Sequence, residues 1–264
     1  MQQYTYTHPY ALILGGSSGL GLASAQELAR EGWPLLIVHR DRKSTRPAIR
    51  AVFTELAQIA PDFHAFNVDA LRADQRAALL QHIAEILGSE NRIGLLLHSI
   101  AKGNLKPMTG DQGPHLQHDD FQLTLAAMAT SLYDWVYELH TAQLFSPHAC
   151  VLSFTSEGNQ KAWPYYGAVA AAKAALEAIT RQIALEFAPY GIRANCIQAG
   201  TTDTPSLRMI PGHEQLIDLS IQRNPYGRLT RAEDVARVVS LLARPEAAWI
   251  NGSIIPVDGG EHLR

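Results

Sequence analysis

The chain has 264 residues, of which 47% are hydrophobic and 18% are charged, and its formal net charge is −3 at pH 7. This composition allows a large apolar core and excludes a strong charge attraction to nucleic acid or to an anionic membrane. No apolar run approaches the length of a membrane span, and residues 1–9 lack the charged and apolar regions of a signal peptide. Cys150 and Cys196 each lie inside an apolar run, so we expect no disulfide and a cytoplasmic location.

Short apolar runs alternate with helix-forming stretches along the whole chain. The predicted strands are 10–14, 34–39, 63–68, 94–98, 150–154, 193–198 and 253–257. The predicted helices are 22–30, 45–59, 73–87, 119–143, 166–187 and 232–242. Strands that are apolar throughout and separated by helices indicate a parallel sheet covered on both faces. We therefore predict an α/β fold, a single doubly wound Rossmann-type domain over residues 1–264 with a mostly or wholly parallel seven-stranded sheet.

Two segments rich in glycine, proline and polar residues, 102–118 and 204–227, are predicted to be mobile. Both follow strands, at the edge where sheets of this kind bind ligands. Residues 204–227 are expected to cover a substrate, with apolar lining candidates Leu207, Met209, Ile210 and Leu216. His115 and His118 have the spacing of metal ligands but lie in a polar loop without a third partner, so we predict no metal site.

A glycine-rich turn, Gly15 to Gly21, directly follows the first predicted strand and precedes the first predicted helix. Such a turn presents backbone N–H groups and the positive end of the helix dipole to a phosphate. Glycine permits positive φ angles and a close approach of the phosphate to the backbone. The spacing differs from the G-x-G-x-x-G fingerprint, and an ordinary tight turn is the alternative. The predicted nucleotide-binding residues are Gly15, Ser17, Ser18, Gly19, Leu20 and Gly21.

The residues that follow the second predicted strand favour NADP(H) as the cofactor. An acidic residue there accepts a hydrogen bond from the ribose of NAD, whereas arginine accommodates the 2′-phosphate of NADP. Arg40 and Arg42 suit the phosphate, but Asp41 between them keeps NAD(H) as the alternative. At the end of the third strand, Asn67 and Val68 are candidates to frame the adenine.

A tyrosine and a lysine, Tyr166 and Lys173, lie seven residues apart in a predicted helix. At ~100° per residue the two side chains differ by only about 20° around the helix axis and lie about 10 Å apart along it. A lysine ammonium near a tyrosine lowers the pKa of the phenol, which can then protonate an oxyanion near neutral pH. The alternative is a packing tyrosine beside a surface lysine.

The chain resembles the short-chain dehydrogenase/reductase family from about residue 10 to its end. The resemblance is carried by the glycine turn, Asn67-Val68, residues 97–101 (Leu-His-Ser-Ile-Ala), residues 199–204 (Ala-Gly-Thr-Thr-Asp-Thr) and residues 255–260 (Ile-Pro-Val-Asp-Gly-Gly). It implies that Lys173 also holds the nicotinamide ribose and that a homo-oligomer, a dimer or tetramer, forms through the helices at 119–143 and 166–187. It adds as cofactor-binding candidates Ser99, Ile100, Ala101, Gly200, Thr202 and Thr204.

Three departures from the ordinary family pattern narrow the resemblance. The residue four before Lys173 is Val169 instead of tyrosine, the strand at 94–98 is followed by His98-Ser-Ile-Ala instead of Asn-Ala-Gly, and no asparagine stands at 126–128. This set resembles the bacterial enoyl-acyl-carrier-protein reductases of fatty acid biosynthesis, whose catalytic pair is Tyr-x6-Lys. Ser156 stands where the ordinary family has its catalytic serine, and it is either a further hydrogen-bond donor or the polar end of a strand. Tyr165 is a competing acid.

A physical argument connects the shifted tyrosine with conjugate reduction. A ketone reductase delivers hydride to the carbon that bears the oxygen, whereas an enoyl reductase delivers it to Cβ and the oxyanion forms several bonds away. The acid must therefore lie farther from the nicotinamide, as Tyr166 does if it stands one turn earlier on the helix. We predict an NADP(H)-dependent reductase of an α,β-unsaturated acyl thioester, with a carbonyl or alcohol oxidoreductase and a non-catalytic NADP(H) sensor as alternatives.

Overall fold

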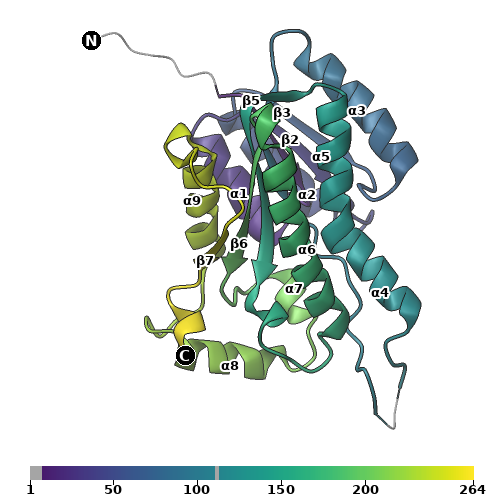
Figure 1. Ribbon diagram of the computed structural model, residues 1–264, viewed down its shortest axis with the longest axis vertical. Coiled ribbons are helices and arrows are strands. Elements are labelled where there is room, and N and C mark those ends of the chain that lie inside the picture. The colour runs from purple at the N-terminus through teal and green to yellow at the C-terminus, as the bar shows by residue number, and fades with distance from the viewer. Residues whose placement is uncertain (1–7, 111–112) are drawn as a thin grey trace.

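Seven parallel strands form the sheet at the centre of the molecule, in the order β3-β2-β1-β4-β5-β6-β7 (Figure 1). The computed structural model describes residues 8–110 and 113–264; most of the segment examined for a signal peptide, residues 1–7, lies outside the described residues. The strands are β1 (Tyr10–Leu14), β2 (Leu35–His39), β3 (Phe63–Asn67), β4 (Ile93–His98), β5 (Phe145–Ser156), β6 (Arg193–Ala199) and β7 (Ile254–Val257). The predicted doubly wound parallel sheet is confirmed.

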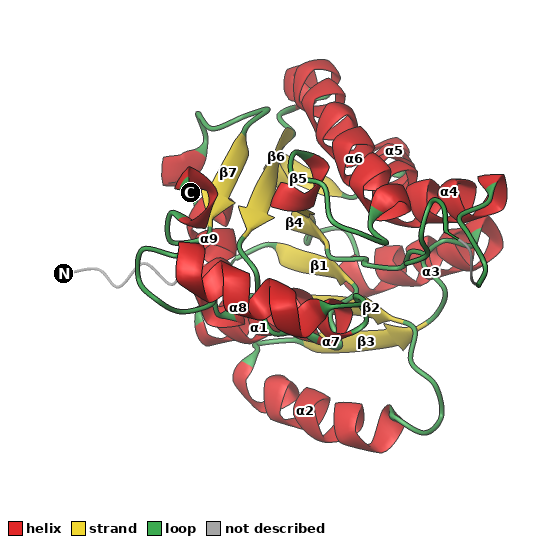
Figure 2. Cartoon of the chain, turned by 90° about the horizontal axis from the view of Figure 1, so that it is seen from below, coloured by secondary structure: helices red, strands yellow, loops and turns green. Residues whose placement is uncertain are grey.

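Helices cover both faces of the sheet, as Figure 2 shows. One layer consists of α1 (Gly19–Arg30), α2 (Arg46–Ile59) and α9 (Ala232–Ala243), and the other of α3 (Ala73–Leu87), α5 (Ser131–Thr141) and α6 (Gly167–Glu186). Further helices are α4 (His118–Leu125), α7 (Pro205–Arg208) and α8 (His213–Arg223). Among the described residues, no helix is both long and apolar enough to cross a membrane.

The two layers bury opposite faces of the same strands. In β1, Leu12 and Leu14 belong to the cluster that contains Trp135 of α5, whereas Ala11 and Ile13 belong to the cluster that contains Leu28 of α1. Successive side chains of a strand point to opposite faces, so a strand that is covered on both sides has no polar position. All five residues of β1 are accordingly buried.

The predicted helix 119–143 is interrupted, which corrects the sequence prediction. A π-helical turn, η1 (Ala126–Thr130), separates α4 from α5. A π turn contains one residue more than an α turn, and such turns occur frequently at functional sites. Within and beside it, the Ser131 hydroxyl donates to the carbonyl of Ala127 and lies 2.8 Å from His98 Nε2 at the end of β4. The contact between His98 and Ser131 joins segments that are distant in the chain, and the hydrophobic periodicity of the sequence gives no sign of it.

The two segments predicted to be mobile frame the carboxyl edge of the sheet. Residues 204–227 contain helices α7 and α8, which the sequence pattern does not predict, and α8 lies at the bottom of Figure 1 beside the C-terminus. Residues 102–118 have little regular structure, residues 111–112 lying outside the description, and are fastened by Asp120 of α4. The Asp120 carboxylate accepts hydrogen bonds from Asn104, from Lys106 and from the amide of Gln117.

Candidate active site

The glycine turn meets the end of β4 at the point where the strand order reverses. Strand β1 pairs with β2 on one side and β4 on the other, and ligands of such sheets bind at the carboxyl end of this switch point. Gly15 has a φ of +85°, and a Cβ added to it would lie 2.4 Å from the carbonyl oxygen of Ser99. A Cβ on Gly21 would lie 2.3 Å from the carbonyl oxygen of Gly15. A side chain is thus excluded at Gly15 and at Gly21.

The start of helix α1 provides the donors that a diphosphate requires. The helix begins at Gly19, and its first intrahelical bond runs from the amide of Leu22 to the carbonyl of Ser18. The amides of Gly19, Leu20 and Gly21 therefore precede the intrahelical ladder and can donate to an anion. Ser17 lies within the same turn. These residues fit the diphosphate of a dinucleotide.

The segment that follows β6 closes over the glycine turn. A Cβ on Gly19 would lie 3.4 Å from Cγ2 of Thr204, so the turn and this segment face each other at van der Waals distance. Thr204 caps helix α7 by accepting a hydrogen bond from the amide of Leu207. Thr202 is buried and donates to the carbonyl of Gly200. These three predicted cofactor contacts (Gly200, Thr202 and Thr204) share one edge with the glycine turn.

In the loop after β2, the Asp41 carboxylate contacts a histidine ring, whereas Arg40 and Arg42 are exposed. Asp41 Oδ2 lies 2.7 Å from Nδ1 of the buried His39 ring. Asn67, at the end of β3, accepts from the amide of Asp41 and donates to its carbonyl, so it holds this loop in place. Arg40 forms an ion pair of 2.9 Å with Asp69, and Arg42 is exposed. The amide of Val68, the other adenine candidate, donates to the carbonyl of His39.

Residues 98–101, at and after the end of β4, lie beside the glycine turn. The amide of Ser99 donates to the carbonyl of Leu14, which fixes this stretch beside the glycine turn. Ile100 packs partly against the core, and Ala101 is exposed. His98 is 2% exposed, and burial, with a smaller contribution from Lys173, lowers its pKa to about 3. The imidazole is therefore neutral at physiological pH.

Tyr166 is the N-cap residue of α6, directly before the first helical residue. Its hydroxyl lies 3.4 Å from Oγ of Ser156, the last residue of β5, within hydrogen-bond distance. The ring is closely backed by Gly158, because a Cβ there would lie 2.5 Å from Tyr166 Cε1. The neighbouring Tyr165 has a left-handed φ of +67° and is 39% exposed. Of the two tyrosines, Tyr166 contacts the predicted serine.

Lys173 is buried on the same helix, about two turns further along. Its Nζ donates a 2.7 Å hydrogen bond to the carbonyl of Phe154, two residues before Ser156. Burial lowers the pKa of Lys173 to about 8, against the opposing effects of Cys196 and Glu177. The amine is thus predominantly charged at neutral pH. Tyr166, Lys173 and Ser156 are brought together over the last three residues of β5.

The direction of the Tyr166 pKa differs from the expectation. Burial raises the pKa of the phenol, and the hydrogen bond with Ser156 opposes this effect. The ammonium of Lys173 donates its hydrogen bond to the backbone of β5, at the carbonyl of Phe154. Tyr166 is therefore a neutral phenol at physiological pH, the form that can donate a proton.

Three polar residues near Tyr166, Lys173 and Ser156 are not identified as site residues from the sequence. Glu177, 6% exposed, accepts 2.6 Å hydrogen bonds from Thr155 and Asn159. It stands four residues after Lys173, a spacing that places both on one face of α6 and could have identified it. Thr155 and Asn159 carry no comparable signal, because their contact with Glu177 depends on how β5 meets α6.

The histidine pair at 115 and 118 is not part of a metal cluster. In the described ranges no three or more histidine, cysteine, aspartate or glutamate side chains are grouped so that they could hold a metal ion. Asp120, next to this pair, is bound to Lys106 at 2.8 Å. Cys150 and Cys196 are both free and buried.

Comparison with known proteins places this geometry in a family. A family model described as enoyl-(acyl carrier protein) reductase matches residues 15–262. The chain is similar to 1-cyclohexenylcarbonyl-CoA reductase of Streptomyces collinus, with 26% identity over 98% of this chain and 89% of the relative. It is 26% identical to a probable 2,4-dienoyl-CoA reductase of Bacillus subtilis, over 96% of each chain. The crystal structure of the enoyl-acyl-carrier-protein reductase (NADH) of Aquifex aeolicus superimposes with a TM-score of 0.85, at 24% identity and over 98% of both chains.

Because the family model and these relatives are named reductases, the protein is an oxidoreductase of a class that binds a nicotinamide cofactor. Because the family model spans nearly the whole chain, the protein belongs to the short-chain dehydrogenase/reductase family, in its enoyl-reductase-like group.

The buried His98 predicts a specific loss of stability in acid. The histidine pKa is about 3 in the folded chain against 6.5 unfolded, so between these values the unfolded state binds more protons and stability falls as pH falls. From pH 7 to pH 5 this one group should remove about 2 kcal/mol of unfolding free energy. Urea unfolding at both pH values measures the loss, and His98→Gln should show a correspondingly smaller one.

The matched control is His82→Gln, which changes a histidine whose side chain is 57% exposed on α3. This variant should keep the pH dependence of the wild type. Equal pH dependence in wild type and His98→Gln would contradict the assignment of the acid-sensitive term to His98.

Proposed function

We propose that the protein is an NADP(H)-dependent reductase that transfers hydride to Cβ of an α,β-unsaturated acyl thioester, in the manner of enoyl-acyl-carrier-protein reductases. One observation carries the proposal. The ordinary tyrosine position of the family holds Val169, which is buried in an apolar cluster with Met128 and Ala172, while the phenol lies one turn earlier at Tyr166. The similar acyl-CoA reductases act on thioesters of unsaturated acids by their names, which supports this substrate class.

In the proposed reaction, the reduced nicotinamide supplies the hydride. Tyr166 stabilises and protonates the enolate oxygen that develops on the thioester, and its burial keeps the phenol protonated beforehand. Lys173 carries the positive charge that favours a developing phenolate and holds the ribose of the cofactor, while its bond to Phe154 fixes its position. The Ser156 hydroxyl lies 3.4 Å from the tyrosine oxygen, and in the proposed reaction it donates a further hydrogen bond to that oxygen.

The segment 204–227 is proposed to enclose the acyl chain within what we take to be one domain. Helices α7 and α8 extend over the carboxyl edge of the sheet, next to Thr202 and Thr204. Within this segment the side chains of Leu207 and Ile210 are buried, and that of Leu216 is partly buried. Met209 is 74% exposed and is the weaker lining candidate.

The Ser156–Tyr166 contact also favours a second candidate function. A serine that hydrogen-bonds the acidic tyrosine is the arrangement of the ordinary carbonyl and alcohol oxidoreductases of the family, so reduction of a ketone is the alternative. A third candidate, a cofactor sensor without catalysis, is disfavoured because both Tyr166 and Lys173 are present and partnered.

The role of Tyr166 as the acid can be tested with two tyrosine variants. With NADPH as reductant, the wild type should reduce crotonyl thioester faster than a 3-oxoacyl thioester, and Tyr166→Phe should lose roughly 10²-fold or more of the crotonyl rate because the general acid is removed. The loss of NADPH absorbance measures both rates. Tyr165→Phe is the matched control, since it removes the hydroxyl of the exposed neighbouring tyrosine, and it should keep the wild-type rate.

Turnover of the 3-oxoacyl thioester alone would establish the carbonyl reductase instead. Binding of NADPH without turnover of either thioester would favour the sensor. Loss of activity in Tyr165→Phe but not in Tyr166→Phe would contradict the assignment of the acid.

A preference for NADP(H) is supported by the state of the loop after β2. The carboxylate of Asp41, which would favour NAD(H), is engaged by the His39 ring. Arg40 and Arg42 are near the surface where the 2′-phosphate of the adenosine ribose would lie. Loss of a charged hydrogen bond is worth about 1.5–3 kcal/mol.

Arg42→Gln should therefore weaken NADPH binding by about tenfold or more and leave the affinity for NADH unchanged. Titration calorimetry with each cofactor measures the two dissociation constants. The control is Arg50→Gln, which removes an exposed arginine on α2. A wild type that binds NADH more tightly than NADPH, or an equal loss for both cofactors, would contradict the proposed preference.

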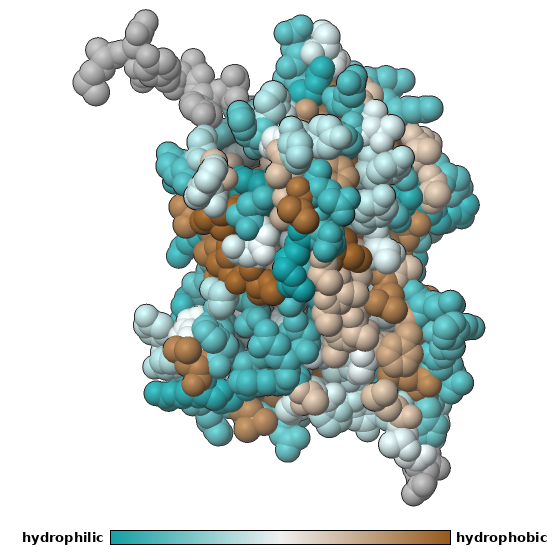
Figure 3. Space-filling view, in the orientation of Figure 1, coloured by the Kyte–Doolittle hydropathy of each residue, from teal (hydrophilic) through white to brown (hydrophobic). Residues whose placement is uncertain are grey.

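A homo-oligomer is proposed to form through α5 and α6. Hydrophobic and weakly hydrophobic residues extend over α6 on the face shown in Figure 3. A hollow of about 430 Å³ lies between the two helices, lined by Thr130, Tyr133, Ala178, Ile179, Arg181, Gln182, Ile183, Glu186 and Phe187. Tyr133 and Tyr137 stack on each other and are 45% and 51% exposed.

Two free buried thiols are compatible with the reducing cytoplasm, where we place the protein.

Tyr133→Asp should convert the oligomer to a monomer, because a carboxylate would be buried at the contact without a partner. Sedimentation velocity at several protein concentrations measures the mass. Ile59→Asp, at a position that is 52% exposed on α2, is the control and should leave the mass unchanged. A monomeric wild type would refute the proposal.

A further inference from the structure

The short turn that follows β5 contacts both the tyrosine and the helix that carries it. This turn, η2 (Glu157–Asn159), begins directly after Ser156. Gly158 backs the Tyr166 ring so closely that a Cβ there would lie 2.5 Å from Cε1. Asn159 donates a 2.6 Å hydrogen bond to the carboxylate of Glu177 on α6. The position of the turn and the position of the phenol are therefore linked by direct contact.

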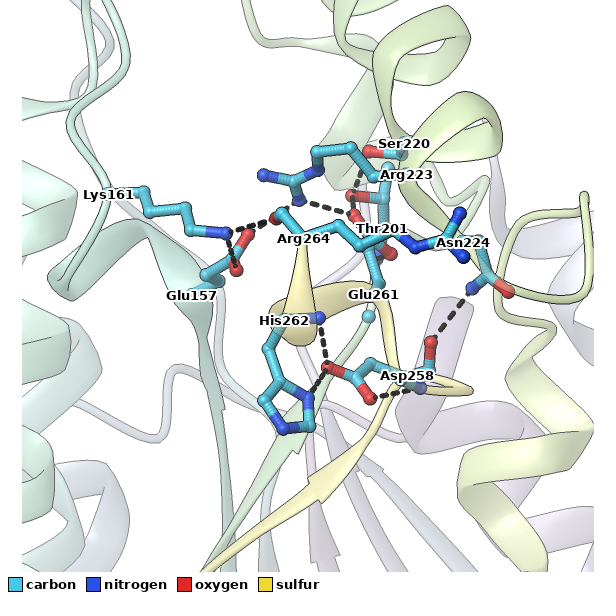
Figure 4. Close-up of polar contacts among 12 residues, drawn as sticks. Glu157, Lys161, Thr201, Ser220, Arg223, Asn224, Asp258, Glu261, His262 and Arg264 are labelled. Carbon is cyan, nitrogen blue, oxygen red and sulfur yellow. Dashed lines mark hydrogen bonds and ion pairs between the residues drawn. The ribbon is translucent and has the colours of Figure 1, made fainter.

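The first residue of the turn is bound to helix α8. Arg223, the last residue of α8, donates from Nη2 to Glu157 Oε2 at 2.6 Å and to Glu261 Oε1 at 2.9 Å (Figure 4). The Arg223 side chain is 29% exposed, and those of Glu157 and Glu261 are 21% and 4% exposed. Charged hydrogen bonds of this kind are screened less than surface ion pairs. Glu157 also forms an ion pair of 2.6 Å with Lys161, four residues later, so without Arg223 its carboxylate keeps a partner within its own segment but loses the one on α8.

A second contact holds α8 one turn earlier. Ser220, 1% exposed, donates a 2.7 Å hydrogen bond to Oγ1 of Thr201, in the segment that follows β6. Thr201 in turn donates from its hydroxyl, at 3.0 Å, and from its amide, at 3.2 Å, to Glu261. Glu261 thus receives donors from α8 and from the residue beside Thr202. Figure 4 shows this group of side chains converging from three separate segments.

We propose that Arg223 is a positioning residue that couples the substrate-covering segment to the acid: when α8 is seated, Arg223 fixes Glu157 and with it the turn that supports Tyr166. The inference rests on the proposed function, because it assigns 204–227 to the substrate and Tyr166 to proton transfer. Enclosure of the substrate and orientation of the phenol are then one structural event. Without Arg223, α8 retains its Ser220 contact, but the turn loses its connection to α8.

The test separates positioning from general stability by comparing the effect on kcat with the effect on cofactor binding, and by rescue. In Arg223→Gln, kcat for the enoyl thioester should fall about tenfold, since a small displacement of a catalytic group far from the mutation is costly. The dissociation constant of NADPH should stay within about twofold of the wild type, because the cofactor contacts lie elsewhere. Arg223→Lys, which keeps the charge, should recover part of the lost kcat.

Hydrogen exchange gives a readout that needs no turnover. Amides of residues 157–166 should exchange faster in Arg223→Gln and in Glu157→Gln, and the double variant should resemble either single one because both break the same contact. Arg244→Gln is the matched control, since it removes a half-exposed arginine that forms a 2.8 Å ion pair with Glu31 far from the site. It should change neither kcat nor the exchange of 157–166.

Unchanged exchange of residues 157–166 in Arg223→Gln would overturn the coupling, whatever the enzyme reduces. A fall in kcat that appears equally in Arg244→Gln, or that Arg223→Lys does not recover at all, would assign the effect to stability and also overturn it. A wild type that reduces no enoyl thioester would refute the proposed function alone, and the exchange data would still decide the coupling.

Discussion

The buried ammonium of Lys173 imposes the constraint on which the arrangement of the site depends. A charge that is 8% exposed costs several kcal/mol unless it is hydrogen-bonded, and here the acceptor is the carbonyl of Phe154. This bond fixes the register of α6 across the carboxyl end of β5. With that register set, the N-cap of α6 comes to lie beside Ser156, so the contact of Tyr166 with the strand follows from the position of the lysine.

Much of the fold could be predicted because both faces of the central strands are buried, which makes their sequences almost entirely apolar. A parallel strand covered by helices on both faces has no exposed face, and β1, β2 and β4, which are apolar apart from the terminal histidines of β2 and β4, are buried along their whole length. The glycine turn was equally accessible, since its spacing and its place between a strand and a helix are visible in the sequence, and the close contact of Gly21 with the carbonyl of Gly15 lies within that unit. In both cases the sequence signal is local and the structure adds little that opposes it.

The failures share a different origin, since each depends on residues that are far apart in the chain. The π turn at Ala126–Thr130 lies within a stretch whose periodicity suits a continuous helix. The bond between Arg223 and Glu157 joins residues 66 positions apart, and neither residue stands in a recognisable motif. The pKa of Tyr166 was expected to fall because only its lysine neighbour was considered, whereas burial, which a sequence does not display, raises it.

The burial of Tyr166 also explains why the substrate-covering segment 204–227 should be connected to the turn that supports the phenol. A phenol with a raised pKa keeps its proton until negative charge develops on an acceptor at hydrogen-bond distance. Such an acid is effective only when water is excluded and the acceptor is held in place, because bulk water would otherwise compete for the hydrogen bond. A segment that encloses the substrate and also fixes the support of the phenol meets both conditions together. In the proposed coupling, the Arg223–Glu157 bond supplies this connection at η2, which follows β5, contacts the Tyr166 ring and is bound to α8.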